Sequence, residues 1–143
     1  MESKESWDSY FMRLVKIISS RSCDPNTKHG CIIINDKHRI ISTGYNGPIQ
    51  GIDDSVVPLT RPHKYFWLLH AEENAEAFCK ESMEGGTVYI TGFPCNRCFR
   101  TLAQRGVKRI VYGDVKSKCL DPIECEETFK IALQCNLKLE EFK

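Results

Sequence analysis

The sequence predicts an α/β fold in which helices cover both faces of one mixed sheet. Short β-branched runs alternate with segments of helical periodicity, in the order helix, strand, strand, helix, strand, helix, strand, helix, strand. Such alternation is typical of a sheet with helices on both sides. The chain of 143 residues is 41% hydrophobic and shows no repeat, linker or low-complexity segment, which suits one core. We therefore expect residues 1–143 to form a single domain.

The N-terminal half is expected to hold a helix, a hairpin and a long loop. Apolar residues recur at helical spacing over 7–18, and Ser6 is available as the N-cap. The β-branched runs 31–35 and 39–45 are separated by polar residues, which predicts a β-hairpin. The irregular stretch 46–61 follows, and loops of this length are commonly functional.

The C-terminal half is expected to alternate helices and strands. The predicted elements are a helix at 69–81, a strand at 87–91, a helix at 95–105, a strand at 108–112, a helix at 121–134 and a strand at 137–142. Pro94 and Gly106 delimit the second of these helices. The segment Asp121-Pro122-Ile123-Glu124 combines a capping box with a proline at the first helical position.

Charge and composition restrict the partners. The net charge of +1 offers no basic stripe for nucleic acid, and no apolar run approaches the ~20 residues of a membrane span. The N-terminus carries no pattern of a secretory signal, so we expect a cytoplasmic protein. Eight cysteines are present, and without a signal we interpret most of them as small buried thiols rather than a disulfide framework.

A zinc site is predicted at His70, Cys95 and Cys98. Nitrogen and thiolate ligands suit zinc, and three protein ligands leave one position open for water, as in catalytic sites. Each part of the set is expected in the first turn of a helix, where the helix dipole favours thiolates. Pro94 and Glu72 complete the pattern H-x-E…P-C-x-x-C of the zinc nucleobase deaminases. We expect one catalytic Zn²⁺ per chain and Glu72 as the residue that moves protons.

Short motifs follow one another along almost the whole chain: Arg21-Ser22-Cys23-Asp24-Pro25, Gly44-Tyr45-Asn46-Gly47, Asp53-Asp54, HAEENA (70–75), FPCNRC (93–98) and KRIVY (108–112). In this order and spacing they resemble the deoxycytidylate deaminases. The resemblance implies a three-layer α/β/α cytidine-deaminase-like sandwich with one mixed five-stranded sheet. It also implies hydrolysis of dCMP to dUMP and ammonia, with dUMP supplied for thymidylate synthesis, and a homohexamer regulated by dCTP and dTTP.

The same resemblance implies substrate contacts. The backbone at Ala71 and Pro94 is expected to hold the base edge, Asn46 the sugar or phosphate, and Arg21 the phosphate, while Tyr112 closes the pocket. Each has a structural alternative. Asn46 begins the common turn dipeptide Asn-Gly and could serve only the backbone geometry of a turn. Arg21 could interact with the dipole at the C-terminal end of the first helix, and Tyr112 could be an ordinary aromatic residue of a strand.

The loop that contains Gly47, Gly51 and Asp53 resembles the allosteric nucleotide site of the regulated members. Here Pro48 lies one position earlier than the proline of those members, so regulation is left open.

Two other functions fit the motifs. The first is a deaminase of the same fold acting on dCTP, free cytidine, guanine or a tRNA adenosine, and the near-neutral charge speaks against tRNA. The second is a non-catalytic zinc module that binds nucleotides. The retained Glu72 speaks against that module, because a structural zinc site needs no extra carboxylate.

Overall fold

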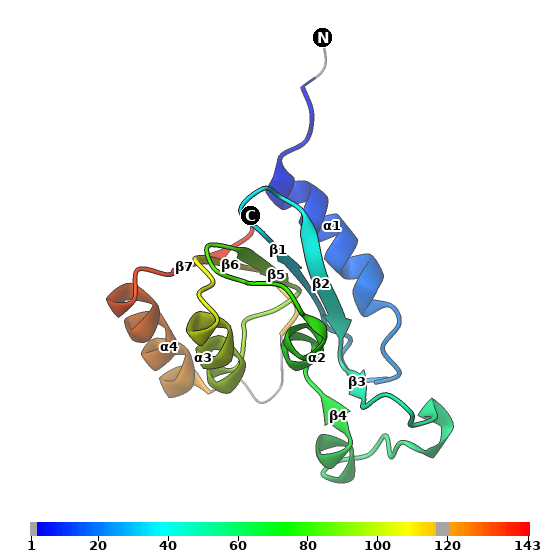
Figure 1. The fold of residues 1–143 in the computed structure, drawn as a ribbon. Coiled ribbons are helices and arrows are strands. Elements are labelled where there is room, and N and C mark those ends of the chain that lie inside the picture. Colours follow the sequence, from blue (N-terminus) through cyan, green and yellow to red (C-terminus); the bar gives the residue numbers. More distant parts are fainter. Residues whose placement is uncertain (1–2, 117–120) are drawn as a thin grey trace.

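The centre of the fold is a five-stranded sheet with the spatial order β2-β1-β5-β6-β7 (Figure 1). The computed structural model describes residues 3–116 and 121–143. The strands are β1 Gly30–Ile34, β2 Ile40–Tyr45, β5 Thr87–Ile90, β6 Arg109–Tyr112 and β7 Lys138–Glu141. Strand β1 is antiparallel to β2 and β5, whereas β5, β6 and β7 run parallel. The predicted mixed five-stranded sheet is confirmed.

Helices cover both faces of this sheet. One face carries α1, and the other carries α2, α3 and α4 (Figure 1). Their bounds are α1 Trp7–Ser19, α2 Ala71–Phe78, α3 Asn96–Gln104 and α4 Pro122–Gln134. Side chains of β1 alternate between the two layers, because Ile32 packs with Phe11 of α1 while Ile33 packs with Phe99 of α3. The three-layer α/β/α prediction is therefore confirmed.

The parallel half of the sheet determines where a site can form. Strand β5 leads into α3 and returns in β6, and β6 leads through α4 into β7. The carboxyl ends of β5 and β6 therefore meet at one edge, which is where α/β sheets commonly bind ligands. Within the described residues, no helix is both long and apolar enough to span a bilayer.

Helix α2 lies directly against β2 because Gly44 has no side chain. A Cβ atom at Gly44 would lie 2.6 Å from the carbonyl oxygen of Ala71 and 2.5 Å from the backbone nitrogen of Ala75. Two side chains secure the contact. The Ser42 hydroxyl donates to the carbonyl of Ala75 at 2.6 Å, and the Asn74 amide donates to the carbonyl of Tyr45 at 2.8 Å. The glycine of the Gly-Tyr-Asn-Gly motif thus has a packing role.

The segment from 46 to 70 differs most from the prediction. It contains the two-residue strands β3 (Gly47–Pro48) and β4 (Leu68–Leu69), which pair with each other, and the short 3₁₀ helices η1 (Asp54–Val56) and η2 (His63–Phe66). These elements form an arm, residues 46–69, which extends from the sheet (Figure 1).

Helix α2 is shorter than the predicted 69–81. Leu69 has the apolar character of a helix start but pairs in β4, and Cys79 has an extended backbone that ends the helix. The other predicted boundaries agree with the structure within two residues.

Candidate metal centre and active site

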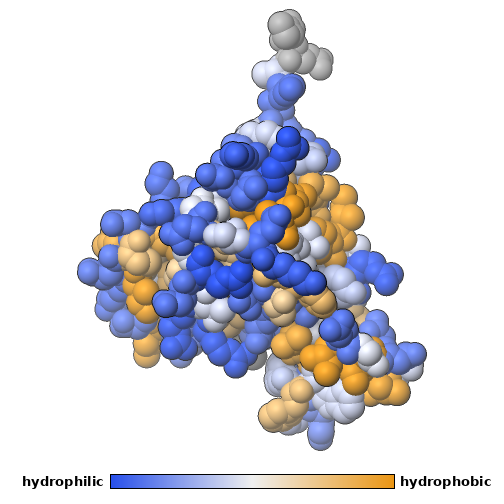
Figure 2. Space-filling model, viewed as in Figure 1, coloured by the Kyte–Doolittle hydropathy of each residue, from blue (hydrophilic) through white to orange (hydrophobic). Residues whose placement is uncertain are grey.

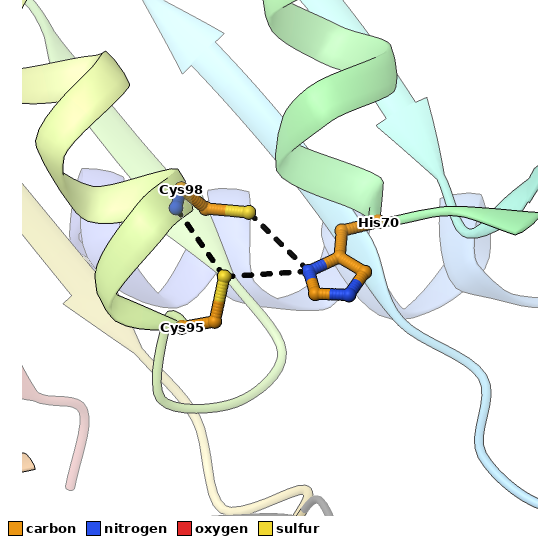
Figure 3. Close-up of side chains that lie close together, drawn as sticks. All are labelled: His70, Cys95 and Cys98. Carbon is orange, nitrogen blue, oxygen red and sulfur yellow. Dashed lines mark hydrogen bonds between the residues drawn. The ribbon is translucent and has the colours of Figure 1, made fainter. Parts of the chain in front are cut away.

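His70, Cys95 and Cys98 meet at the carboxyl edge of the sheet. The Nδ1 atom of His70 lies 3.4 Å from Cys95 Sγ and 3.3 Å from Cys98 Sγ. Figure 3 shows the imidazole at the start of α2 pointing toward the two sulfur atoms at the start of α3. One ligand atom from each residue lies within 4.8 Å of the others. The sequence prediction that these three side chains converge agrees with the structure.

The donor set fits a tetrahedral zinc ion. Ligands about 2.0–2.3 Å from zinc at tetrahedral angles lie roughly 3.5–3.8 Å from one another, and the nitrogen–sulfur distances of 3.3 and 3.4 Å are close to this spacing. One imidazole and two thiolates leave a fourth position for water. His70, Cys95 and Cys98 therefore have the chemistry and the spacing to hold Zn²⁺.

The start of α3 favours a negative charge on the cysteine pair. Cys95 is the N-cap residue, not a first-turn residue as predicted, and its sulfur accepts the backbone N–H of Cys98 at 3.3 Å. A hydrogen bond from the Cys98 thiol, aided by His70, lowers the pKa of Cys95 to about 4. The same hydrogen bond raises the pKa of Cys98, and a metal ion that binds both sulfur atoms would displace the Cys98 proton.

Glu72 lies in the first turn of α2, two residues after His70. Its side chain is only 6% exposed, and this burial raises the pKa of its carboxyl group to about 7. A carboxyl group with that pKa can accept and return a proton near neutral pH. His70 itself is the N-cap of α2, and Glu72 is one of the buried residues of that helix.

A cavity of about 460 Å³ opens beside these residues, a volume suited to a small molecule. The residues that line its wall come from the loops around the metal-binding group and from the arm: Asp24, Thr27, His29, Asn46, Arg61, Lys64, Tyr65, Leu68, Leu69, His70, Ala71, Glu72, Ile90, Gly92, Phe93, Cys95 and Glu124. Metal ligands and the buried carboxylate of Glu72 thus share a cavity with two cationic side chains, Arg61 and Lys64.

The predicted substrate residues fall into two groups. Asn46 and Ala71 line the cavity, and the buried Pro94 lies between two residues of its wall. Arg21 and Tyr112 are not among the described residues of the wall, and Arg21 is exposed. Tyr112 contacts a residue of the wall, because its ring packs edge-on against Phe93 with 5.0 Å between centroids.

Asn46 is committed to the backbone of the neighbouring loop. Its Oδ1 accepts the N–H of His29 at 2.8 Å, and its Nδ2 donates to the carbonyl of Thr27 at 2.9 Å. It therefore holds two other wall residues in place. The turn-geometry alternative does not describe this role, because the side chain itself makes the contacts.

Several wall residues are not among those predicted from the sequence. Lys64 pairs with Asp24, and both side chains are buried although they are 40 positions apart. The signal for Asp24 was its place in the Arg-Ser-x-Asp-Pro motif, whereas nothing in the sequence marks Lys64 as buried. Glu124 was interpreted as part of a capping box, yet its carboxylate accepts the backbone N–H of Asn96.

The loop expected to be allosteric has local structural roles. Gly47 pairs in β3, and Gly51 has a φ of +92°, a backbone conformation that favours glycine. The carboxylate of Asp53 accepts the N–H of Ser55 at 2.8 Å and so caps η1. Regulation through Gly47, Gly51 and Asp53 stays a prediction.

Comparisons with known proteins agree with this geometry. The chain is 39% identical over 105 residues to an uncharacterized deaminase of Aliivibrio fischeri, covering 73% of this chain and 70% of that protein. It is 36% identical over 114 residues to the human deoxycytidylate deaminase, covering 74% of this chain and 64% of that protein. A Caenorhabditis elegans relative is covered over 54% of its length, so the chain spans between about half and 70% of these relatives.

Solved structures show the same fold. The dCMP deaminase of the cyanophage S-TIM5, in complex with dCMP and dUMP, superposes with a TM-score of 0.74, covering 99% of this chain and 100% of that one at 24% identity. The family model of the cytidine and deoxycytidylate deaminase zinc-binding region matches residues 5–114, which include His70, Cys95 and Cys98. The chain belongs to the cytidine and deoxycytidylate deaminase family.

Proposed function

We propose that this chain catalyses the zinc-dependent hydrolytic deamination of dCMP to dUMP and ammonia. The observation that carries the proposal is the buried Glu72 carboxylate, which lines the same cavity as the ligands His70 and Cys95. A zinc site that served only structure would need no such carboxylate and no adjoining cavity. The similarity to curated deoxycytidylate deaminases supports dCMP as the substrate.

The chain's own residues provide the proton transfers. When bound, zinc supplies water of lowered pKa, from ~15.7 toward ~7, for attack on C4 of the cytosine. Glu72 accepts the proton that this water releases and donates it to N3, and a further transfer through the same carboxyl group lets the C4 amine leave as ammonia. Burial of Glu72 serves this role, because it keeps the proton affinity of the carboxylate high.

The cations of the cavity orient the nucleotide. The base belongs at the metal end, so the 5′-phosphate belongs near Lys64 and Arg61. Lys64 is neutralised by the buried Asp24, whereas Arg61 makes no ion pair among the described residues. Its guanidinium carbon lies 5.9 Å from the centre of the Tyr65 ring. We assign Arg61 the role of phosphate partner in place of Arg21.

We also propose that the protein is a homo-oligomer in which the arm is buried at the interface between subunits. In addition, we propose that residues 1–143 act as one deaminase domain. Apolar side chains of the arm lie in solvent, with Phe66 86% exposed and Ile49 and Val56 also exposed. Figure 2 shows hydrophobic residues gathered on this part of the surface among hydrophilic ones, and exposed apolar patches commonly mark interfaces. The domain proposal is supported by β7, which completes the sheet beyond the matched region.

The substrate is tested by ammonia release from a panel of dCMP, dCTP, deoxycytidine, guanine and a tRNA anticodon stem. We expect the highest kcat/KM with dCMP, loss of activity after zinc is removed by a chelator, and recovery when zinc is restored. A higher kcat/KM for any other compound of the panel would contradict the substrate assignment. Repeating the dCMP assay with dCTP and dTTP present tests regulation.

A further inference from the structure

The first turn of α4 contacts the turn that carries the metal-binding cysteines. The Oε1 atom of Glu124 accepts the backbone N–H of Asn96 at 3.1 Å. The side-chain amide of Asn96 donates to Thr128 Oγ1 at 3.0 Å, and that hydroxyl donates to the carbonyl of Glu124 at 2.7 Å. Thr128 is completely buried. The backbone and the side chain of Asn96, which directly follows Cys95, are therefore both held by α4.

Glu124 satisfies a donor that the start of α3 cannot satisfy itself. The first N–H groups of a helix lack partners within the helix. Here the N–H of Cys98 donates to Cys95 Sγ at 3.3 Å and the N–H of Phe99 donates to the carbonyl of Cys95 at 2.9 Å. The N–H of Asn96 is taken by Glu124. A carboxylate at this position also interacts favourably with the helix dipole.

A second contact secures the other flank of the same turn. Phe93, which lines the cavity, packs against Phe129 of α4 with 5.3 Å between ring centroids. Helix α4 thus contacts the chain on both sides of Cys95: Phe129 packs against Phe93 before it, and Glu124 and Thr128 bind Asn96 after it. Glu124 itself lies in the cavity wall, close to the metal end. Helix α4 begins after the region matched by the family model, which ends at residue 114.

We propose that Glu124 is a positioning residue for the metal centre. Its carboxylate holds the N–H of Asn96, and this contact keeps Cys95 and Cys98 at the separation that zinc requires. The role deepens the proposed function, because it concerns how the same site is kept ready for metal. It needs an acceptor oxygen at residue 124 and does not need a negative charge.

The test compares Glu124→Ala, Glu124→Gln and the control Glu126→Ala in the full chain. Glu126 lies on the same helix but is exposed and pairs with Lys130 at 3.5 Å. The zinc dissociation constant is measured by competition with a chromophoric chelator, and the ligand geometry by the visible absorption of the Co²⁺-substituted protein. Partners of metal ligands commonly change affinity by 10–100-fold when removed. For Glu124→Ala we expect about 10-fold weaker zinc binding and an altered Co²⁺ spectrum.

The other two variants are expected to bind zinc like the parent. Glu124→Gln retains near-parental zinc affinity because its amide oxygen still accepts the N–H of Asn96, and Glu126→Ala is unchanged. Parental zinc affinity in Glu124→Ala would overturn the proposal. Equally weakened zinc binding in Glu124→Ala and Glu124→Gln would also overturn it, because this result would indicate that residue 124 must carry a negative charge. If Glu124→Ala does not fold, Glu124→Met, which keeps the side-chain volume but removes the acceptor oxygen for the N–H of Asn96, carries the test, with weaker zinc binding expected and unchanged binding contradicting the proposal.

The readouts separate this proposal from the substrate assignment. Zinc affinity and the Co²⁺ spectrum are measured without any nucleotide. A protein that shows the expected zinc pattern but does not deaminate dCMP would refute the substrate and leave the role of Glu124 intact.

Discussion

Lys64 Nζ lies 3.1 Å from each carboxylate oxygen of Asp24, and both side chains are buried in the cavity wall. The Asp24 carboxylate also accepts the backbone N–H groups of Asn26 and Thr27. Burial alone would raise the pKa of Asp24, but these N–H groups and Lys64 outweigh it and lower the pKa. The pair thereby joins the loop after α1 to the arm across the cavity.

Removal of one partner leaves the other charge buried. We predict that Lys64→Met lowers the free energy of unfolding by about 3–5 kcal/mol, as is typical when a buried ion pair loses one member. Chemical denaturation at neutral pH measures the loss. The exposed Lys37→Met is the control for loss of positive charge. A change within ~0.5 kcal/mol for Lys64→Met would mean that the pair does not contribute to stability.

A second ion pair predicts acid sensitivity. Arg109 donates to both oxygens of Asp8, at 2.7 and 2.6 Å, and Tyr89 donates to Asp8 Oδ1 at 2.7 Å. These bonds, that from Arg109 most strongly, lower the pKa of Asp8. Stability from a lowered carboxyl pKa is present above the unfolded value of about 3.9 and is lost as pH falls through the folded value.

We therefore predict that Asp8→Asn is less stable than the parent at pH 7 and that the difference shrinks below about pH 4. Urea denaturation at pH 7 and pH 3 measures both differences. Equal destabilisation at the two pH values would show that the asparagine disrupts packing and that the Asp8 charge is not what stabilises the contact.

Close packing at Gly44 links the sheet to the active site. An alanine there would overlap the backbone of α2 at Ala71 and Ala75, so we predict that Gly44→Ala costs roughly 1–3 kcal/mol of stability and also lowers kcat by displacing Glu72. Gly47→Ala is the control, because its Cβ would meet only the ring of Tyr45, at 3.3 Å. Parental kcat in Gly44→Ala would contradict the proposed link.

The phosphate assignment predicts a selective loss of affinity. Arg61→Gln is expected to raise KM for dCMP by about 10-fold or more, since hydrogen bonds to charged groups contribute about 1.5–3 kcal/mol, and to leave KM for deoxycytidine nearly unchanged. Arg21→Gln, outside the described cavity wall, is expected to change neither. The reverse result, with Arg21→Gln selectively raising KM for dCMP, would identify Arg21 as the phosphate partner.

The sheet and the metal ligands were predictable because local patterns encode them. The β-branched run of β1 and the helix starts at Cys95 and Asp121 carry strong local signals. The arm was not predictable in the same way, since two-residue strands have no periodicity. The pairing of Asp24 with Lys64 and the place of Arg61 in the cavity wall depend on how distant segments fold around the cavity, and a single sequence holds no signal for that.

The central claim is that Glu72 transfers the protons of a zinc-dependent deamination. Its most direct test is kcat for ammonia release from dCMP by Glu72→Ala, in samples shown by metal analysis to carry as much zinc as the parent. Positioned acid–base groups contribute about 10²–10⁴-fold to rates, so we predict a loss of at least about 100-fold. A Glu72→Ala variant with full zinc content and parental kcat would contradict the account.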